Sequence, residues 1–191
     1  MPTRAATRPP HLREKSQLMS PSEIERTLVR LAHEINERNN GVEDLVLVGI
    51  KRRGVPLAQR LAKLLQRIER KEIPVGTLDI SLYRDDLTTL GPKPVVHKGE
   101  IGATVTDKVI VLVDDVLYTG RTVRAAMEAL FAHGRPRLVQ LCVLIDRGHR
   151  ELPVEASYVG RKIQTSDIEI IEVQLKELDE AERVLLVEKI S

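Results

Sequence analysis

Two adjacent carboxylates, Asp114 and Asp115, stand a few residues before a turn of small and hydroxyl-bearing residues at 119–122. The next segment, residues 123–132, has the composition of a helix and is followed by Gly134 as a stop signal. The turn is therefore expected at a helix N-terminus, where backbone N–H groups and the helix dipole bind a phosphate and threonine hydroxyls add donors. These residue types predict a phosphate site with two acids beside it.

The acids need an element that presents them, and residues 109–113 form such an element. This run is β-branched or leucine with no alternation, which is typical of a strand buried on both faces of a parallel sheet. Ligands in open α/β sheets bind at the carboxyl ends of the strands, where Asp114 and Asp115 would lie. An Asp-Asp pair that merely ends a strand is the simpler interpretation, but strand, acids and turn follow here in the order that a binding site requires.

A second charged loop, Lys51 to Arg53, lies between a predicted strand at 45–50 and a predicted helix at 55–70. Strand, loop and helix in this order place the loop at the same edge of the sheet. Three cations suit a highly charged anion, although a solvated turn would have the same composition. The segment has neither the Walker spacing nor Gly-x-Gly-x-x-Gly, which disfavours a nucleoside triphosphatase or a dinucleotide site.

The remaining elements frame these loops. A first helix is expected from Pro21, capped by Ser20 and Glu23, with His33 on its exposed basic face. Residues 84–106 are poor in core residues and are expected to form a mobile lid or a hairpin. Because no further long helix follows, the C-terminal third is expected to form a small cap and edge strands over the carboxyl ends of the sheet, where part of a ligand would be recognised. Further strands are predicted at 75–82, 138–145, 157–160, 168–175 and 183–190.

The composition bounds the class of protein. A chain of 191 residues with 42% hydrophobic content suits one domain, expected at 20–191. The single cysteine, Cys142, excludes a disulfide framework and is expected to be a buried thiol. No apolar stretch is long enough for a membrane span, so we expect a cytoplasmic protein with no membrane partner.

An N-terminal arm, residues 1–19, is expected to be disordered. Residues 1–20 carry four cations against Glu14 alone, a net +3, with three prolines and no periodicity. Such an arm either has no function or contacts nucleic acid. Aromatic residues make up 2% of the chain, which disfavours base stacking on an aromatic platform, so RNA contacts would depend on Arg, Lys and shape.

Residues 109–122 match the signature of the type I phosphoribosyltransferases, which bind 5-phosphoribosyl 1-pyrophosphate (PRPP). Five segments together resemble the PyrR family more narrowly, bacterial proteins that are both pyrimidine operon attenuation regulators and uracil phosphoribosyltransferases. These segments are 32–34, 48–54, 79–86, 113–122 and 146–153. The resemblance covers about residues 20–190. It implies a type I phosphoribosyltransferase fold, a mainly parallel twisted α/β sheet flanked by helices, with a small hood and a flexible loop at about 84–106.

The resemblance implies a reaction in which uracil and PRPP give UMP and pyrophosphate, with Mg²⁺ bound to the pyrophosphate. Asp114 and Asp115 would hold the ribose hydroxyls and, with Arg84 of the flexible loop, act in catalysis. The turn at 119–122 would hold the 5′-phosphate and the loop at 51–53 the pyrophosphate. Asp146 either coordinates metal or only ends its strand. The substrate-binding residues carried over are Lys51, Arg52, Arg53, Arg84, Asp114, Asp115, Val116, Leu117, Tyr118, Thr119, Gly120, Arg121, Thr122 and Arg147.

The second implied activity is UMP-dependent binding of a stem-loop in the leader of pyrimidine operon mRNA. The residues carried over for it are Arg30, His33, Arg150 and Arg161. The sequence departs from the family where Glu155 replaces an expected cation and Val29 a common threonine, which weakens a phosphate-binding face. Lys162 and the basic arm could compensate.

Two alternatives therefore stay open beside the bifunctional enzyme: an RNA-binding attenuator with weak catalysis, and a phosphoribosyltransferase for another base. The family forms dimers that assemble further, so a homo-oligomer is also expected.

Overall fold

The computed structural model describes residues 11–81, 83 and 101–190, which form two sheets and three helices. The larger sheet is parallel throughout, as expected from the sequence. Its strands lie in the order β3 (Val75–Leu78), β2 (Leu45–Ile50), β4 (Val109–Leu117), β5 (Leu138–Asp146) and β6 (Tyr158–Lys162).

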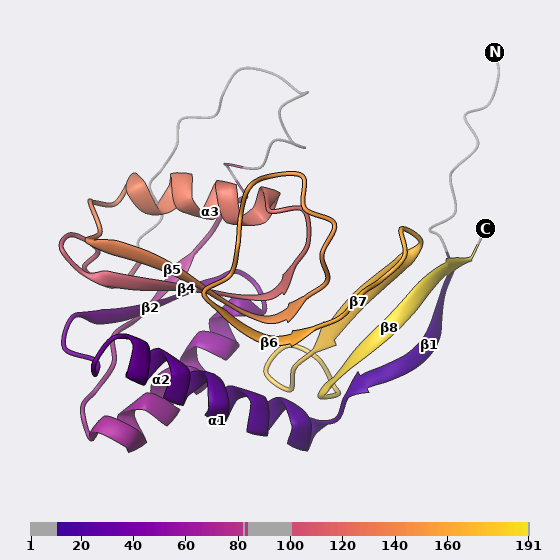
Figure 1. Ribbon diagram of the computed structural model, residues 1–191, viewed down its shortest axis with the longest axis horizontal. Helices are drawn as coiled ribbons and strands as arrows, with labels where there is room; N and C mark the ends of the chain where they lie inside the picture. Colours follow the sequence, from indigo (N-terminus) through magenta and orange to yellow (C-terminus); the bar gives the residue numbers. More distant parts are fainter. Residues whose placement is uncertain (1–10, 82, 84–100, 191) are drawn as a thin grey trace, which may run out of the picture.

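Helices α1 (Pro21–Arg38) and α2 (Gly54–Glu69) cover one face of this sheet, and α3 (Arg121–Phe131) covers the other (Figure 1). Buried side chains form two clusters, one between the sheet and α1 with α2, the other between the sheet and α3. All six residues of β2 and the first five of β4 are buried. The prediction that uninterrupted apolar runs form strands buried on both faces is thus confirmed.

The first helix begins where the sequence predicts. The Ser20 hydroxyl accepts the Glu23 N–H at 3.3 Å, and the Glu23 carboxylate accepts the Ser20 N–H at 2.8 Å, so the capping box is present. At the far end, the Asn39 amide donates to the Tyr158 hydroxyl at 3.1 Å, and that hydroxyl donates to Gln140 at 2.9 Å. These bonds fix the end of α1 onto β5 and β6.

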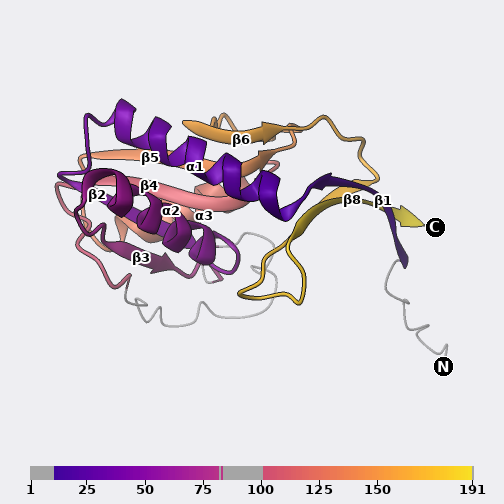
Figure 2. The same ribbon diagram turned by 90° about the horizontal axis from the view of Figure 1, so that it is seen from below.

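A smaller antiparallel sheet, the hood sheet, lies at one end of the molecule (Figures 1 and 2). It consists of β1 (His11–Met19), β8 (Arg183–Ile190) and β7 (Glu169–Gln174) in that order. The C-terminal runs therefore divide between the two sheets, since β6 is an edge strand of the parallel sheet and only β7 and β8 enter the hood.

The expectation that the whole N-terminal arm is disordered is wrong for residues 11–19. They pair along β8 through their backbone, and their cations contact acids of the other two hood strands: Arg13 lies 2.8 Å from Glu188 of β8 and Lys15 lies 2.5 Å from Glu169 of β7. A polar edge strand leaves no apolar alternation in its sequence, so composition alone suggested disorder. Residues 1–10 lie outside the described residues.

The expected flexible loop is also shorter than predicted at its C-terminal end. Ile101 and Val105 are buried, and the Thr77 N–H donates to the Ile101 carbonyl at 2.9 Å. Ile101 therefore packs beside β3, and Thr106 accepts the Arg135 N–H at 3.4 Å beyond α3. Arg84 and residues 85–100 lie outside the described residues. The strand expected at 75–82 ends at Leu78. None of the described helices is long and apolar enough to span a membrane.

Candidate active site

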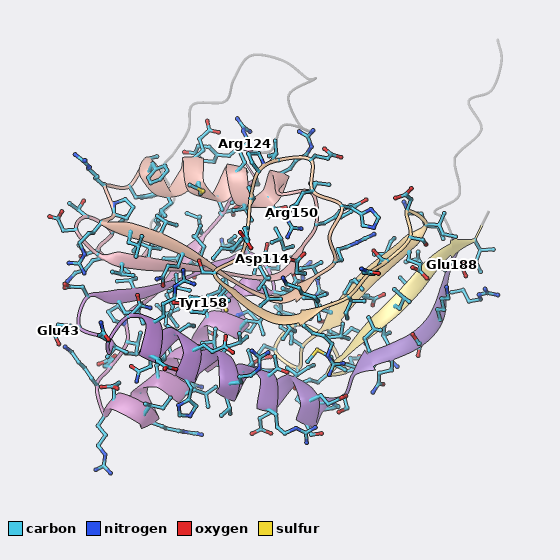
Figure 3. All side chains as sticks on the ribbon, in the orientation of Figure 1. Glu43, Asp114, Arg124, Arg150, Tyr158 and Glu188 are labelled. Atoms are coloured by element: carbon cyan, nitrogen blue, oxygen red, sulfur yellow. The ribbon has the colours of Figure 1, made fainter. Side chains whose placement is uncertain are left out.

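The two acids lie within β4. This strand continues to Leu117, four residues beyond the predicted apolar run at 109–113. Asp114 is 7% exposed, and its Oδ1 accepts the Asp115 N–H at 2.9 Å, while Asp115 is half-buried. Burial first, and then the adjacent Asp115 carboxylate, raise the pKa of Asp114 well above its ordinary value. The pair therefore presents one carboxyl that readily holds a proton beside another, more exposed carboxyl (Figure 3, Asp114 labelled).

The turn after β4 leads into α3 as predicted. Gly120 precedes the helix with a φ of 93°, and a Cβ there would lie 3.2 Å from the Val154 side chain. The N-cap residue, Gly120, has no side chain that could cap α3, and the first N–H groups of the helix point toward the turn. The Thr119 hydroxyl accepts the Arg121 N–H at 3.3 Å, and Thr122 is exposed. The turn keeps the donors that a phosphate would need.

The basic loop lies directly beside the acids because two glycines allow the backbones to touch. A Cβ on Gly54 would lie 2.2 Å from the Val113 carbonyl oxygen, the residue immediately before Asp114. A Cβ on Gly49 would lie 2.5 Å from the Val55 Cα. Only glycine permits this approach. The structure thus brings together the acids, the turn and the loop at 51–53, which the sequence placed at one sheet edge.

The three cations of this loop differ in their contacts. Lys51 is exposed and its Nζ lies 3.4 Å from the Asp79 carboxylate, and Arg52 is also exposed. Arg53 instead donates through Nη2 and Nε to the two oxygens of Asp179, at 2.9 and 3.3 Å. The peptide bond between Lys51 and Arg52 is cis. Arg53 is therefore committed to a carboxylate that the sequence did not reveal.

Arg147, expected to contact a phosphate, is 5% exposed and points into the hood. Its guanidinium donates to the Glu169 carbonyl at 2.9 Å and to the Thr165 hydroxyl at 3.1 Å. It also lies 3.9 Å from the centroid of the Tyr118 ring. Among the described residues, the Arg147 guanidinium packs on the face of the Tyr118 ring. The sequence alone could not indicate this cation–π contact.

Arg150, expected to contact RNA, holds the loop after β5 against the turn at 119–122. It donates to the Tyr118 carbonyl at 2.8 Å, to the Val154 carbonyl at 2.9 Å and to the Asp146 carboxylate at 2.7 Å. The other Asp146 oxygen accepts the Gly148 N–H at 3.0 Å. Both oxygens of Asp146 are therefore engaged, which favours its structural interpretation over metal coordination. Figure 3 shows Arg150 on the α3 side of Asp114.

The other expected RNA-binding residues lie together on a different part of the molecule. Arg30 of α1 donates to the Val159 carbonyl at 3.3 Å and also to the Gly160 carbonyl, while Arg161 of β6 donates to the Leu18 carbonyl and lies 3.4 Å from Glu23. His33 is exposed one turn further along α1. The structure thus joins Arg30, His33 and Arg161 but separates them from Arg150.

A parallel sheet with paired acids and a glycine-containing turn at its carboxyl edge is the arrangement expected of a phosphoribosyltransferase. The phosphoribosyl transferase domain model matches residues 16–179. The Bifunctional protein PyrR of Thermoanaerobacter sp. (strain X514) is 58% identical over 175 residues, which cover 92% of this chain and 98% of that protein. The protein of the same name from Thermus aquaticus is 54% identical over 178 residues, with 93% and 98% covered. This chain belongs to the PyrR family.

Solved structures support the fold. A hypoxanthine phosphoribosyltransferase from Staphylococcus aureus has a TM-score of 0.67 at 20% identity, covering 93% of each chain. One from Trypanosoma cruzi, a ternary complex with substrates, has a TM-score of 0.71 at 19% identity, covering 92% of this chain and 96% of that one. At such low identity these likenesses concern the architecture alone.

Proposed function

We propose that this protein transfers the phosphoribosyl group of PRPP to uracil, giving UMP and pyrophosphate, and that it also binds pyrimidine operon mRNA under control of UMP. The observation that carries the catalytic proposal is the contact of Gly54 with the Val113 carbonyl. That contact sets the basic loop beside the acid pair, with the turn at 119–122 beyond it. Groups suited to bind the diol, the 5′-phosphate and the pyrophosphate of PRPP would then lie together at the carboxyl edge of the parallel sheet.

In this reaction a uracil ring nitrogen forms the new bond to C1 of the ribose as the C1–O bond to pyrophosphate breaks. The bonding electrons leave with pyrophosphate, and the proton of the uracil nitrogen is released. Asp114 and Asp115 would bind the ribose hydroxyls, and the ionised Asp115 would stabilise positive charge developing on the sugar. Because Asp114 holds its proton more readily, it can donate to one hydroxyl oxygen as well as accept.

Mg²⁺ would enter with PRPP and neutralise the leaving pyrophosphate. Among the described residues no group of three or more His, Cys, Asp or Glu side chains could hold a metal ion by itself. The half-buried Asp115 carboxylate and the oxygens of PRPP suit a hard cation that keeps several of its waters. The site thus fits a metal that is shared with the substrate.

The second activity is supported by the cluster of Arg30, His33 and Arg161, which lies away from the acid pair. A basic surface on α1 and β6 would hold RNA through its backbone and loop shape. Glu155, which stands where the family has a cation, is exposed. A protein that uses PRPP, uracil and mRNA would act in the cytoplasm, and a homo-oligomer would present this surface more than once.

The catalytic proposal is tested by incubating the pure protein with labelled uracil, PRPP and Mg²⁺. Wild type is expected to form UMP, and Asp115→Asn to lower kcat/KM by about 100-fold or more, because a charge that stabilises the transition state is lost. Glu43→Gln, a change at an exposed acid at the far end of the molecule in Figure 3, is the control and should match wild type. The absence of UMP with wild type would refute uracil transfer, and turnover with hypoxanthine, guanine or orotate instead would favour another base.

A further inference from the structure

The connection between β7 and β8, residues 175–182, reaches from the hood sheet to the start of α2 (Figure 2). At the tip of this connection, the two carboxylate oxygens of Asp179 accept hydrogen bonds from Nη2 and Nε of Arg53, at 2.9 and 3.3 Å. The same carboxylate accepts the Leu175 N–H at 2.9 Å, so Asp179 also closes its own turn. Its side chain is 22% exposed. One acid thus joins the hood to the basic loop of the active site.

Few other short hydrogen bonds hold the C-terminal end of the basic loop. The Lys51 N–H donates to the Leu78 carbonyl at 3.0 Å and fixes where the loop begins. Where α2 begins, the Val55 and Leu57 N–H groups are 3.4 and 3.5 Å from their carbonyl acceptors, and no side chain caps the helix. The Arg53 side chain therefore supplies the shorter connection at that end.

The pair is charged at neutral pH. Partial burial alone would raise the pKa of Asp179, but hydrogen bonds from Arg53 and from the Leu175 N–H hold it below its ordinary value. A planar guanidinium that grips both carboxylate oxygens fixes orientation as well as distance. Arg53 bound in this way holds the loop, while Lys51 and Arg52 remain at the surface for an incoming anion.

We propose that Asp179 is a positioning residue: through Arg53 it holds residues 51–53 in the shape that receives the pyrophosphate of PRPP. The proposal rests on the proposed function, since it assigns a role to a residue outside the ligand site. It predicts a specific loss of PRPP binding when Asp179 changes, because a loop held in advance binds its ligand at a lower entropic cost.

The chain offers a matched control on the same connection. Arg60, further along α2, donates to both oxygens of Glu177 at 2.7 Å each. Arg60 also donates to Glu182 at the end of the same connection. Removing the Glu177 charge therefore weakens, without abolishing, the hold of α2 on this connection and leaves the Arg53 pair in place. A merely structural role for Asp179 would make Asp179→Asn and Glu177→Gln behave alike.

The test measures steady-state kinetics with PRPP and uracil varied in turn, together with thermal melting, for wild type and three variants. Asp179→Asn and Arg53→Lys are expected to raise KM for PRPP about tenfold, with kcat and KM for uracil within about twofold of wild type. Glu177→Gln should lower Tm about as much as Asp179→Asn and leave KM for PRPP unchanged.

The proposal is overturned if Asp179→Asn leaves KM for PRPP within about twofold of wild type, or if Glu177→Gln raises it equally. Calorimetric titration of each protein with pyrophosphate and Mg²⁺ separates this result from a failure of the proposed function. An inactive wild type would refute uracil transfer, whereas weaker pyrophosphate binding by Asp179→Asn than by wild type and Glu177→Gln would still support the role of Asp179.

Discussion

Asp114 is a residue at which folding and function are opposed. Its carboxyl is buried, and the neighbouring Asp115 raises its pKa further. Folding therefore favours the protonated form of Asp114, and stability falls as pH rises from the ordinary aspartate range through the raised pKa. Above that pKa the site gains the negative charge of Asp114, and this buried charge destabilises the folded protein.

Replacing Asp114 by Asn should therefore stabilise the ligand-free protein while lowering its activity. Near neutral pH the amide avoids the buried charge, and we expect the free energy of unfolding to rise by about 1 kcal/mol and Tm by about 2–4 °C. The gain should shrink toward pH 4, because Asp114 is then protonated in the folded state and also increasingly protonated in the unfolded state, so the two states differ less in charge. Melting curves of both proteins from pH 4 to 8 measure this, and a constant difference across that range would contradict it.

The elements divide into those that the sequence determines locally and those that depend on distant partners. The strand at 109–113, the capping box at Ser20 and the turn before α3 follow from periodicity and cap chemistry, and the structure agrees. Strand β1 does not follow from them, because its support is a backbone ladder to β8 some 170 residues away. Contacts such as Arg53 with Asp179 arise from topology, which local patterns do not encode.

Strand β1 also supports the active site through the hood. Lys15 pairs with Glu169 across the hood sheet, and the Glu169 carboxylate accepts the Ser166 N–H at 2.7 Å. The hydrogen bond from Lys15, then that from the Ser166 N–H, lower the pKa of Glu169 to about 2. Arg147 donates to the carbonyls of the same loop and lies behind Tyr118. Lys15 thus stabilises the loop that orients Tyr118.

Lys15→Met should accordingly lower kcat/KM by a few-fold, whereas Arg13→Met, on the same strand but paired with Glu188 of β8, should not. The pair is partly exposed, so the fall in Tm should be at most about 3 °C. Since the pKa of Glu169 is depressed, this stabilisation is present above the ordinary pKa of glutamate and is lost as pH falls from there to about 2. Equal kinetic effects of the two variants, or a Tm difference that grows with acidity, would refute this account.

At the scale of the whole molecule, the two proposed activities occupy separate regions. The acid pair and the turn lie at the carboxyl edge of the parallel sheet, whereas Arg30, His33 and Arg161 lie where α1 packs on β6. Successive side chains of a strand point to opposite faces, so Lys162 projects away from the α1 side and is poorly placed to replace Arg161. Arg150 belongs to the catalytic edge, since it holds Tyr118 and Asp146.

His33→Ala should therefore weaken binding of the operon leader RNA and spare catalysis, whereas Arg150→Ala should impair both. The loss of one phosphate contact at His33 predicts about fivefold to tenfold weaker binding. Arg150→Ala loosens the loop whose Glu151 and Leu152 N–H groups bind the Thr119 carbonyl. The variant should therefore bind UMP more weakly, and its UMP-dependent RNA binding should also decrease. His133→Ala, just beyond α3 on the opposite face, is the matched control and should change neither activity. Filter binding at several salt concentrations, with and without UMP, alongside the uracil assay, tests the separation. A loss of catalysis in His33→Ala, or full UMP-dependent RNA binding by Arg150→Ala, would show that the two regions are not divided in this way.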